Sequence, residues 1–425
     1  MVKRILSYIQ QTEVIQSASV LVGGTVVAQA IPIALQPFLR RYFEPADFGY
    51  YSIYISIIGI LMVISSLRYE QAIVLPKADS DSVKLVNISL SISLIFSIIL
   101  VAIALLFHTS ILKILSLPQD RIYILFLIPL GTFLFSIFQV YNYWLIRKKK
   151  FKSISVNKFS RRAVEGVSQS TFAITKYSGG LVLGDVIGQL VNAVVSFYQS
   201  VKCGYRLQFV NPKDAGRLLR EYAVFPKVNL LPALMSTICF MLPVVFINKY
   251  YSAEEAGYFD LSKLILSVPL ALVASSFSSV VLNKTADCYR NKKPFIGEIK
   301  PLIWIVLAMS LLEVLIIVLW SESLFTVIFG DKWLVSGEIS KLLVFPYALN
   351  FITSSFTSLF VALNKITWQS VWQVFYFLMI STLPFLSGLS FENFIFAYTT
   401  IEVVANSTMI VLLILLVKNT NEARD

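Results

Sequence analysis

Arg41-Tyr42-Phe43-Glu44-Pro45-Ala46-Asp47-Phe48-Gly49-Tyr50-Tyr51-Ser52 joins two long apolar runs, and its pattern returns in the second half of the chain. The copy is Lys249-Tyr250-Tyr251-Ser252-Ala253-Glu254-Glu255-Ala256-Gly257-Tyr258-Phe259-Asp260, which also joins one apolar run to the next. Three residues are identical at matching places: Tyr42 and Tyr250, Gly49 and Gly257, Tyr50 and Tyr258. A long internal repeat that links apolar spans predicts a membrane transporter built from two related lobes.

The composition is that of a polytopic membrane protein. Of the 425 residues, 57% are hydrophobic and 14% are charged, and the mean hydropathy is +0.75. A net charge of +12 would favour nucleic acid as the partner of a soluble protein. In a membrane chain, basic residues gather in cytoplasmic loops instead, so we expect no nucleic-acid partner. The three cysteines lie far apart and there is one histidine, so we expect no disulfide framework, metal site or cofactor.

The sequence has room for twelve membrane spans, since each needs about 20 mainly apolar residues. In the first half they cover residues 17–39, 48–69, 84–107, 121–146, 154–176 and 179–201. In the second half they cover residues 223–248, 256–282, 300–320, 338–363, 366–388 and 393–417. We therefore predict an all-α polytopic membrane fold of two six-helix lobes, residues 1–208 and 209–425, with Lys202–Tyr222 as the linker.

The fifth span is the unusual one, because it contains two arginines, a lysine and a glutamate. A basic residue at the bilayer centre costs about 2.5–3.5 kcal/mol, so hydropathy alone would reject this span. The flanking segments 147–152 and 202–220 are strongly basic, and both are expected in the cytoplasm. The chain between them must then cross an even number of times, which makes 154–176 a span. The same rule places both termini in the cytoplasm and makes the two lobes a parallel repeat.

One face of the fifth span is polar. Its residues recur at helical spacing: Lys158, Arg161, Arg162, Glu165 and Gln169. A helix with one cationic face and one apolar face is typical of the lining of a water-filled cavity, and pairing of Glu165 with Arg161 still leaves net positive charge. Alternatively, the long basic side chains extend to the inner membrane interface. We take Arg161 and Arg162 as substrate-binding candidates, with Lys158 and Glu165 as secondary ones.

Charged and aromatic residues in other spans add candidates, because lipid tolerates an ionised group only beside a partner or water. Lys227 and Lys263 are candidate substrate-binding cations. Asp260, one turn before Lys263, is either a lumen acid or its neutralising partner. Arg68 is either a lumen residue or half of an interfacial ion pair. Trp372 shares a helix face with amide side chains, as in a sugar-binding surface, or it belongs to an interfacial aromatic belt.

The sequence lacks the common enzyme motifs. It has no Gly-x-x-x-x-Gly-Lys-Ser/Thr loop for nucleotide phosphates, no Gly-x-Ser-x-Gly nucleophile motif and no clustered metal ligands. We therefore expect a protein that is not an enzyme.

The stretch Gln36–Ser52 resembles the segment after the first helix of bacterial polysaccharide transporters of the O-antigen flippase (Wzx) type. In that family an acidic residue, an aromatic, glycine and tyrosine follow a basic–aromatic pair and a proline. Arg68-Tyr69-Glu70-Gln71-Ala72-Ile73 resembles the end of their second helix. The resemblance implies the fold of the multidrug/oligosaccharidyl-lipid/polysaccharide (MOP) exporter superfamily. The implied substrate is undecaprenyl pyrophosphate carrying an oligosaccharide repeat unit of O-antigen, capsule or exopolysaccharide.

On this basis we expect a flippase of the bacterial inner membrane that works by alternating access, with the head group in a cationic cavity between the lobes. Arginine suits such a cavity because its planar fork can hold two phosphate oxygens. A gradient of H⁺ or Na⁺, or removal of the product outside, would supply the energy. The expected partners are the lipid-linked oligosaccharide, membrane lipids, a polysaccharide polymerase and a chain-length regulator.

Two other functions stay open. A drug/cation antiporter of the same fold would need acidic residues in its lumen, whereas the spans have an excess of arginine and lysine. A membrane-bound glycan polymerase or ligase would need a sizeable outer loop, and the predicted outer loops are short.

Overall fold

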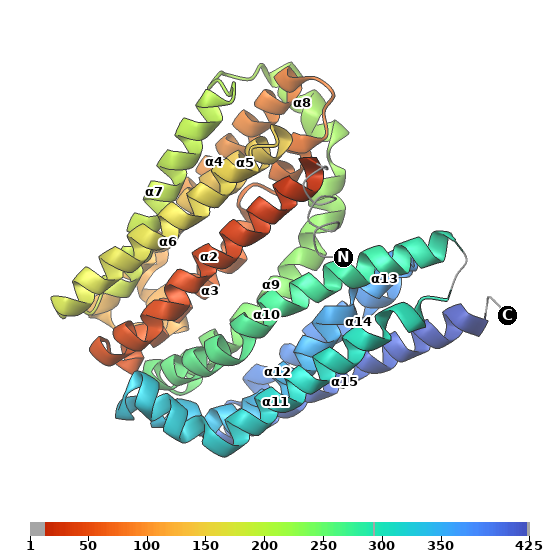
Figure 1. Ribbon diagram of the computed structural model, residues 1–425. Helices are drawn as coiled ribbons and strands as arrows, with labels where there is room; N and C mark the ends of the chain where they lie inside the picture. Colours follow the sequence, from red (N-terminus) through yellow and green to blue (C-terminus); the bar gives the residue numbers. More distant parts are fainter. Residues whose placement is uncertain (1–12, 292–293, 423–425) are drawn as a thin grey trace. The chain divides into compact units, whose positions relative to one another are not determined.

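The computed structural model describes residues 13–291 and 294–422, and within them every regular element is a helix (Figure 1). The first-half helices are α2 (Glu13–Tyr42), α3 (Pro45–Ser65), α4 (Asp79–Leu115), α5 (Tyr123–Arg147), α6 (Phe151–Ile174), α7 (Gly180–Lys202) and α8 (Pro212–Glu221). The second-half helices are α9 (Leu230–Tyr250), α10 (Ala253–Arg290), α11 (Ile296–Phe329), α12 (Leu334–Phe356), α13 (Ser358–Ala362), α14 (Ile366–Ile380) and α15 (Phe391–Glu422). Each of the twelve predicted spans overlaps a helix, and the span 338–363 covers both α12 and α13, so the predicted all-α fold is confirmed.

The chain forms two compact units, residues 1–237 (unit 1) and 238–425 (unit 2). Both repeat the same order of packing. In unit 1, α5 packs against α3, α4 and α7, and α6 packs against α7. In unit 2, α12 packs against α10, α11 and α15, and α14 packs against α15. The predicted boundary between residues 208 and 209 stays a prediction.

The repeated motif forms the same turn in both halves. The first copy ends α2 at Tyr42 and begins α3 at Pro45, and the second ends α9 at Tyr250 and begins α10 at Ala253. In the first turn of α3, the backbone N–H of Glu44 donates to the Asp47 carboxylate at 3.3 Å. In the second, the Ser252 hydroxyl accepts from the backbone N–H of Glu255 at 3.1 Å. Each side chain satisfies a backbone donor at a helix start, which fixes where the new helix begins.

Nine helices among the described residues are long and apolar enough to cross a membrane. α6 is not among them, as its charges predict, yet it lies between α2 and α7. The two basic segments that flank the α6–α7 hairpin contact the same helix start: Arg147 donates to Asp79 at 2.9 Å, and Arg217 donates to Asp81 at 2.9 Å. Both segments therefore lie at one end of unit 1, which confirms that the hairpin runs away from that end and back.

Several helix ends differ from the predicted spans. α3 ends at Ser65, before the predicted residue 69, because Leu67 and Arg68 take left-handed backbone angles (φ 52° and 67°) and a 3₁₀ turn, η1 (Tyr69–Val74), follows. α4 and α10 continue to Leu115 and Arg290, beyond the predicted 107 and 282. Hydropathy detects only the part of a helix that matches the hydrocarbon thickness, and a helix can continue past it.

The segment predicted as a linker packs on unit 1. It contains α8, and its side chains Tyr205 and Leu218 are 1% and 0% exposed in a cluster with Trp144 of α5. Lys84 of α4 donates to Asp214 of α8 at 2.8 Å, and the Tyr69 hydroxyl donates to the Leu219 carbonyl at 2.9 Å.

Candidate functional site

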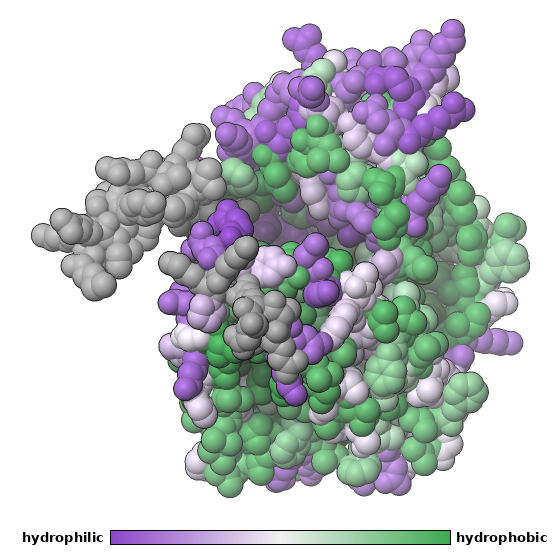
Figure 2. Space-filling view, turned by 90° about the vertical axis from the view of Figure 1, so that its right-hand side faces the viewer, coloured by the Kyte–Doolittle hydropathy of each residue, from purple (hydrophilic) through white to green (hydrophobic). Residues whose placement is uncertain are grey.

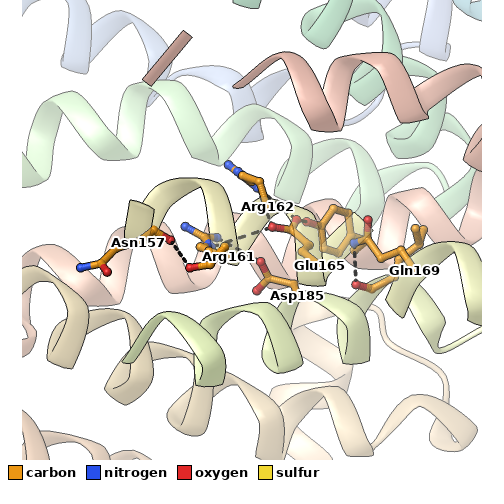
Figure 3. Close-up of polar contacts among 9 residues, drawn as sticks. Asn157, Arg161, Arg162, Glu165, Gln169 and Asp185 are labelled. Atoms are coloured by element: carbon orange, nitrogen blue, oxygen red, sulfur yellow. Dashed lines mark hydrogen bonds and ion pairs between the residues drawn. The ribbon is translucent and has the colours of Figure 1, made fainter. Parts of the chain in front are cut away.

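The polar face of α6 is turned inward, toward α7 and α2 (Figure 3). Asn157, Glu165 and Gln169 are 0%, 4% and 6% exposed, whereas Val167 and Ile174 on another face are 68% and 65% exposed. The Asn157 amide donates to the Ser196 hydroxyl of α7 at 3.0 Å, and the Gln169 amide donates to the Leu181 carbonyl at 3.0 Å. A helix that hydropathy rejects as a span is thus accommodated because its polar groups find partners inside the unit.

Three glycines of α7 allow this close approach. Gly180, Gly184 and Gly188 are spaced by four residues and face α6. A Cβ on Gly184 would lie 2.4 Å from Cγ of Gln169, and one on Gly188 would lie 2.8 Å from Cβ of Glu165. Small residues at this spacing let two membrane helices pack backbone to backbone. The glycines therefore set the distance at which the side chains of α6 meet α7.

Four charged side chains form a network at this contact (Figure 3). Arg161 donates to Asp185 of α7 at 3.1 Å, and its Nε lies 3.9 Å from Glu165. Arg162 donates to both oxygens of Glu165, at 3.0 and 2.8 Å. The Tyr51 hydroxyl of α3 donates to Glu165 at 3.4 Å. The structure thus brings Arg161, Arg162 and Glu165 together as predicted, and adds a second carboxylate that balances the second arginine.

Asp185 is the residue that the sequence analysis missed. It begins a stripe of buried polar residues on α7 at helical spacing: Asp185, Gln189, Asn192, Ser196 and Ser200. The same rule that singled out the charges of α6 applies to an aspartate inside an apolar span. The mean hydropathy of this span does not reveal its polar residues, because apolar residues surround each of them in the sequence.

A cavity of about 110 Å³ opens beside this network, and helices α2, α5, α6 and α7 line it. Its walls are Thr25, Ala28, Gln29, Phe138, Lys158, Arg161, Arg162 and Asn192. The three charged residues in the wall are all cations. Glu165 and Asp185, which contact the arginines, are not among the described residues that line the cavity. Lys158 donates to the Thr25 hydroxyl of α2 at 2.9 Å.

Several buried polar atoms at this contact have no hydrogen-bond partner within the protein. They are Oδ1 and Nδ2 of Asn192, Oδ1 of Asn157, Oδ2 of Asp185, Oε1 of Gln189 and Nε of Arg161. A buried polar group without a partner costs about 1–3 kcal/mol, so such groups normally meet water or a ligand. Asn192 is fully buried, and it is among the residues that line the cavity.

The other predicted site residues lie elsewhere. Lys227 is exposed in a π-helical turn, η3 (Phe225–Asn229), just before α9. Arg68 is held in the left-handed turn after α3, and its Nε is buried without a partner. In unit 2, Lys263 donates to the Phe240 carbonyl at 2.5 Å, and Asp260 lies on the same helix, α10. The Trp372 indole donates to the Ala405 carbonyl at 2.9 Å, so its polar atom is used within unit 2.

Unit 2 has a polar cluster of its own. Glu402 of α15 is 8% exposed and accepts from the Tyr376 hydroxyl of α14 at 2.6 Å. The ring of Tyr376 stacks on that of Trp372 with centroids 5.2 Å apart. Among the residues that the structure describes, no three histidine, cysteine or acidic side chains come together as metal ligands.

The sequence from residue 38 to 338 matches the family model described as polysaccharide biosynthesis protein. Comparison with curated protein sequences finds no match.

Solved structures of membrane transporters have the same fold. An inward-facing multidrug resistance transporter of the MATE family, in the MOP superfamily, is 14% identical and gives a TM-score of 0.70, covering 94% of this chain and 99% of its own. The lipid II flippase MurJ, in an inward closed conformation, is 13% identical with a TM-score of 0.72, covering 91% of this chain and 86% of its own. A MATE transporter from Vibrio cholerae is 12% identical with a TM-score of 0.58, covering 96% of each chain.

Proposed function

The chain belongs to the polysaccharide biosynthesis protein family and has the fold of MOP superfamily transporters, and from this premise we propose that it is a flippase for lipid-linked oligosaccharides. The substrate is undecaprenyl pyrophosphate carrying one oligosaccharide repeat unit. The protein moves it from the inner to the outer leaflet by alternating access, without chemical change to the substrate.

The cation-lined cavity is the observation that carries this proposal. Lys158, Arg161 and Arg162 line the cavity, and each arginine also contacts a carboxylate. An anion entering the cavity meets these three cations, and none of the described residues in the wall is acidic. Arginine and lysine in this arrangement suit phosphate oxygens. The same cations would repel a cationic drug, which disfavours the drug/cation antiporter.

The size of the cavity limits what it holds. A water molecule needs roughly 10–15 Å³ of such space, so about 110 Å³ accepts several waters or a phosphate group but no oligosaccharide. We assign the pyrophosphate to this cavity and leave the sugars outside it. Lys227 and Lys263 are further cations that we propose for the head group, and Trp372 is a candidate contact for the sugars.

The setting of the proposed activity follows from the topology. We place the protein in the bacterial inner membrane, with the basic end of unit 1 and both termini in the cytoplasm. A gradient of H⁺ or Na⁺, or removal of the product on the outer side, supplies the energy. A polysaccharide polymerase and a chain-length regulator are the partners that would use the product.

The test is the leaflet on which the lipid-linked repeat unit accumulates in a deletion strain, measured with a membrane-impermeant glycan probe on spheroplasts. The proposal expects single units that face the cytoplasm, and their exposure outside when the wild-type gene is restored. Single units already on the outer face would show that translocation is intact, in which case polymerisation or ligation is the better function. Unchanged glycans together with increased drug sensitivity would support the antiporter instead.

A further inference from the structure

A second, larger hollow lies on unit 1, away from the charged cavity. It is a groove of about 740 Å³ between α4, α5 and the segment 207–215. Its α4 wall runs from Asn87 to Ile95, and Ile137 and Tyr141 of α5 also line it. No charged residue is among the described residues that line it. Leu94 and Ile95 are 46% and 58% exposed, so the groove opens on a surface suited to lipid.

The segment between α7 and α8 places exposed apolar side chains at this groove. Leu207 and Phe209 line it and are 76% and 107% exposed. Leaving side chains of this size in water is unfavourable, and covering them with apolar groups is favourable. Apolar residues interleaved with basic ones are typical of a segment that lies in the membrane interface. Figure 2 shows hydrophilic residues concentrated at the level of α8.

Two cations stand beside the groove. Arg206 directly precedes Leu207, and Lys213 directly follows Pro212; both are exposed. The nearby carboxylates already have basic partners, since Lys84 pairs with Asp214 and Arg217 pairs with Asp81. Neither Arg206 nor Lys213 has an ion-pair partner within the described chain. An anionic group bound next to Leu207 and Pro212 would therefore have two uncompensated positive charges beside these lining residues in the sequence.

We propose that this groove binds one anionic diacyl phospholipid of the cytoplasmic leaflet, with an acyl chain along α4 and the phosphate at Arg206 and Lys213. The α4 wall from Asn87 to Ile95 is about 12 Å long at 1.5 Å per residue. One leaflet of a hydrocarbon core of about 30 Å is about 15 Å deep. The groove matches the depth of a single acyl chain, whereas a polyprenyl tail would extend far beyond it. The bound lipid would fill the space between the segment 207–215 and helices α4 and α5.

The test uses the full-length protein in detergent, with native mass spectrometry to count retained lipid and titrations of phosphatidylglycerol and phosphatidylcholine. The variant R206Q/K213Q removes the two cations. The control K113Q/K176Q makes the same charge change at two exposed lysines at the other ends of α4 and α6. A third variant, Ala215→Phe, fills the groove from α8.

The wild type and the control should prefer phosphatidylglycerol, and R206Q/K213Q should lose roughly five-fold in affinity per charge, or roughly 25-fold in all, at low ionic strength. Its affinity for phosphatidylcholine should stay unchanged. Ala215→Phe should weaken binding of both lipids. The proposal fails if the wild type does not discriminate between the lipids, or if R206Q/K213Q behaves like the control. It also fails if undecaprenyl phosphate displaces phosphatidylglycerol from the wild type, because the groove would then hold the substrate tail.

Discussion

Arg161 of α6 and Asp185 of α7 form a hydrogen-bonded ion pair, with 3.1 Å between Nη2 and Oδ1, and the aspartate is completely buried. This pair changes the charge balance of the unusual helix. α6 by itself has two arginines against one glutamate on its polar face, but Asp185 neutralises the second arginine. Lys158 is then the cation of the cavity wall whose partner is a hydroxyl rather than a carboxylate.

Asp185→Asn should destabilise the protein strongly. The substitution removes the charged partner of Arg161, whose side chain is only 13% exposed, and leaves Glu165 at 3.9 Å as its nearest carboxylate. Removing one partner of a buried ion pair costs about 3–5 kcal/mol. The measurement is the free energy of unfolding of the purified protein in detergent. Glu221→Asn, which breaks an exposed pair with Arg217, is the control and should leave the stability nearly unchanged, because solvent screens this pair.

The double variant Arg161→Gln with Asp185→Asn separates the ion pair from the aspartate alone. Because both charges are gone, it should regain part of the stability that Asp185→Asn loses. If the two single substitutions instead add up in the double variant, Arg161 and Asp185 do not act as a pair.

Gly188→Ala should weaken the packing of α6 on α7. The new Cβ would lie 2.8 Å from Cβ of Glu165 and 3.1 Å from the Arg161 carbonyl oxygen, so a backbone has to move. Overpacking of this kind costs about 1–3 kcal/mol. Gly216→Ala in α8 is the matched control, since a Cβ there meets nothing within 4 Å and alanine favours a helix. Equal unfolding free energies for the two variants would contradict the close approach of the helices.

The fold could be predicted from the sequence because the patterns that determine it are local. The spans, the repeated turn at Tyr42 and Tyr250 and the crossing of α6 depend only on hydropathy, spacing and the distribution of basic residues. Only part of the candidate site could be predicted from the sequence. Arg161, Arg162 and Glu165 lie on one helix, so their spacing alone predicts that they come together. Their partner Asp185 lies on another helix, and the pattern within a single span does not indicate which neighbouring helix a residue faces.

The docking of α8 depends on contacts that a sequence pattern does not encode. The polar composition of the segment after α7 predicts a linker that does not pack on the helices. Leu218 and Tyr205, two apolar positions in that segment, instead bury themselves against α4 and α5. Short amphipathic helices of this kind are stabilised by tertiary packing, and their place appears only when the partner surface is known.

The contact between α8 and α4 should weaken in acid. The hydrogen bond from Lys84, followed by the positive charges of Lys84 and Arg217, lowers the pKa of Asp214 below its ordinary 3.8. Because the folded-state pKa is the lower one, ionised Asp214 stabilises the fold above pH 3.8, and this contribution is lost as the pH falls through the lowered value. Asp214→Asn should therefore be less stable than the wild type near neutral pH, and the two unfolding curves should converge in acid. A difference in stability that does not change with pH would argue against the role of Asp214.

Lys158→Gln should impair transport without unfolding the protein. Lys158 lines the cavity and donates to a neutral hydroxyl, so its removal leaves no buried carboxylate unpaired. A hydrogen bond to a charged group is worth about 1.5–3 kcal/mol, so losing this cation should reduce head-group binding and translocation roughly 10-fold or more. Lys158→Arg keeps the charge and should retain most of the activity. Lys152→Gln changes the same charge in the exposed first turn of α6 and should transport like the wild type.

The readout is the rate at which the impermeant probe labels outward-facing repeat units, normalised to the amount of protein in the membrane. Wild-type rates for Lys158→Gln would mean that the head group does not occupy this cavity, even if the protein proves to be a flippase.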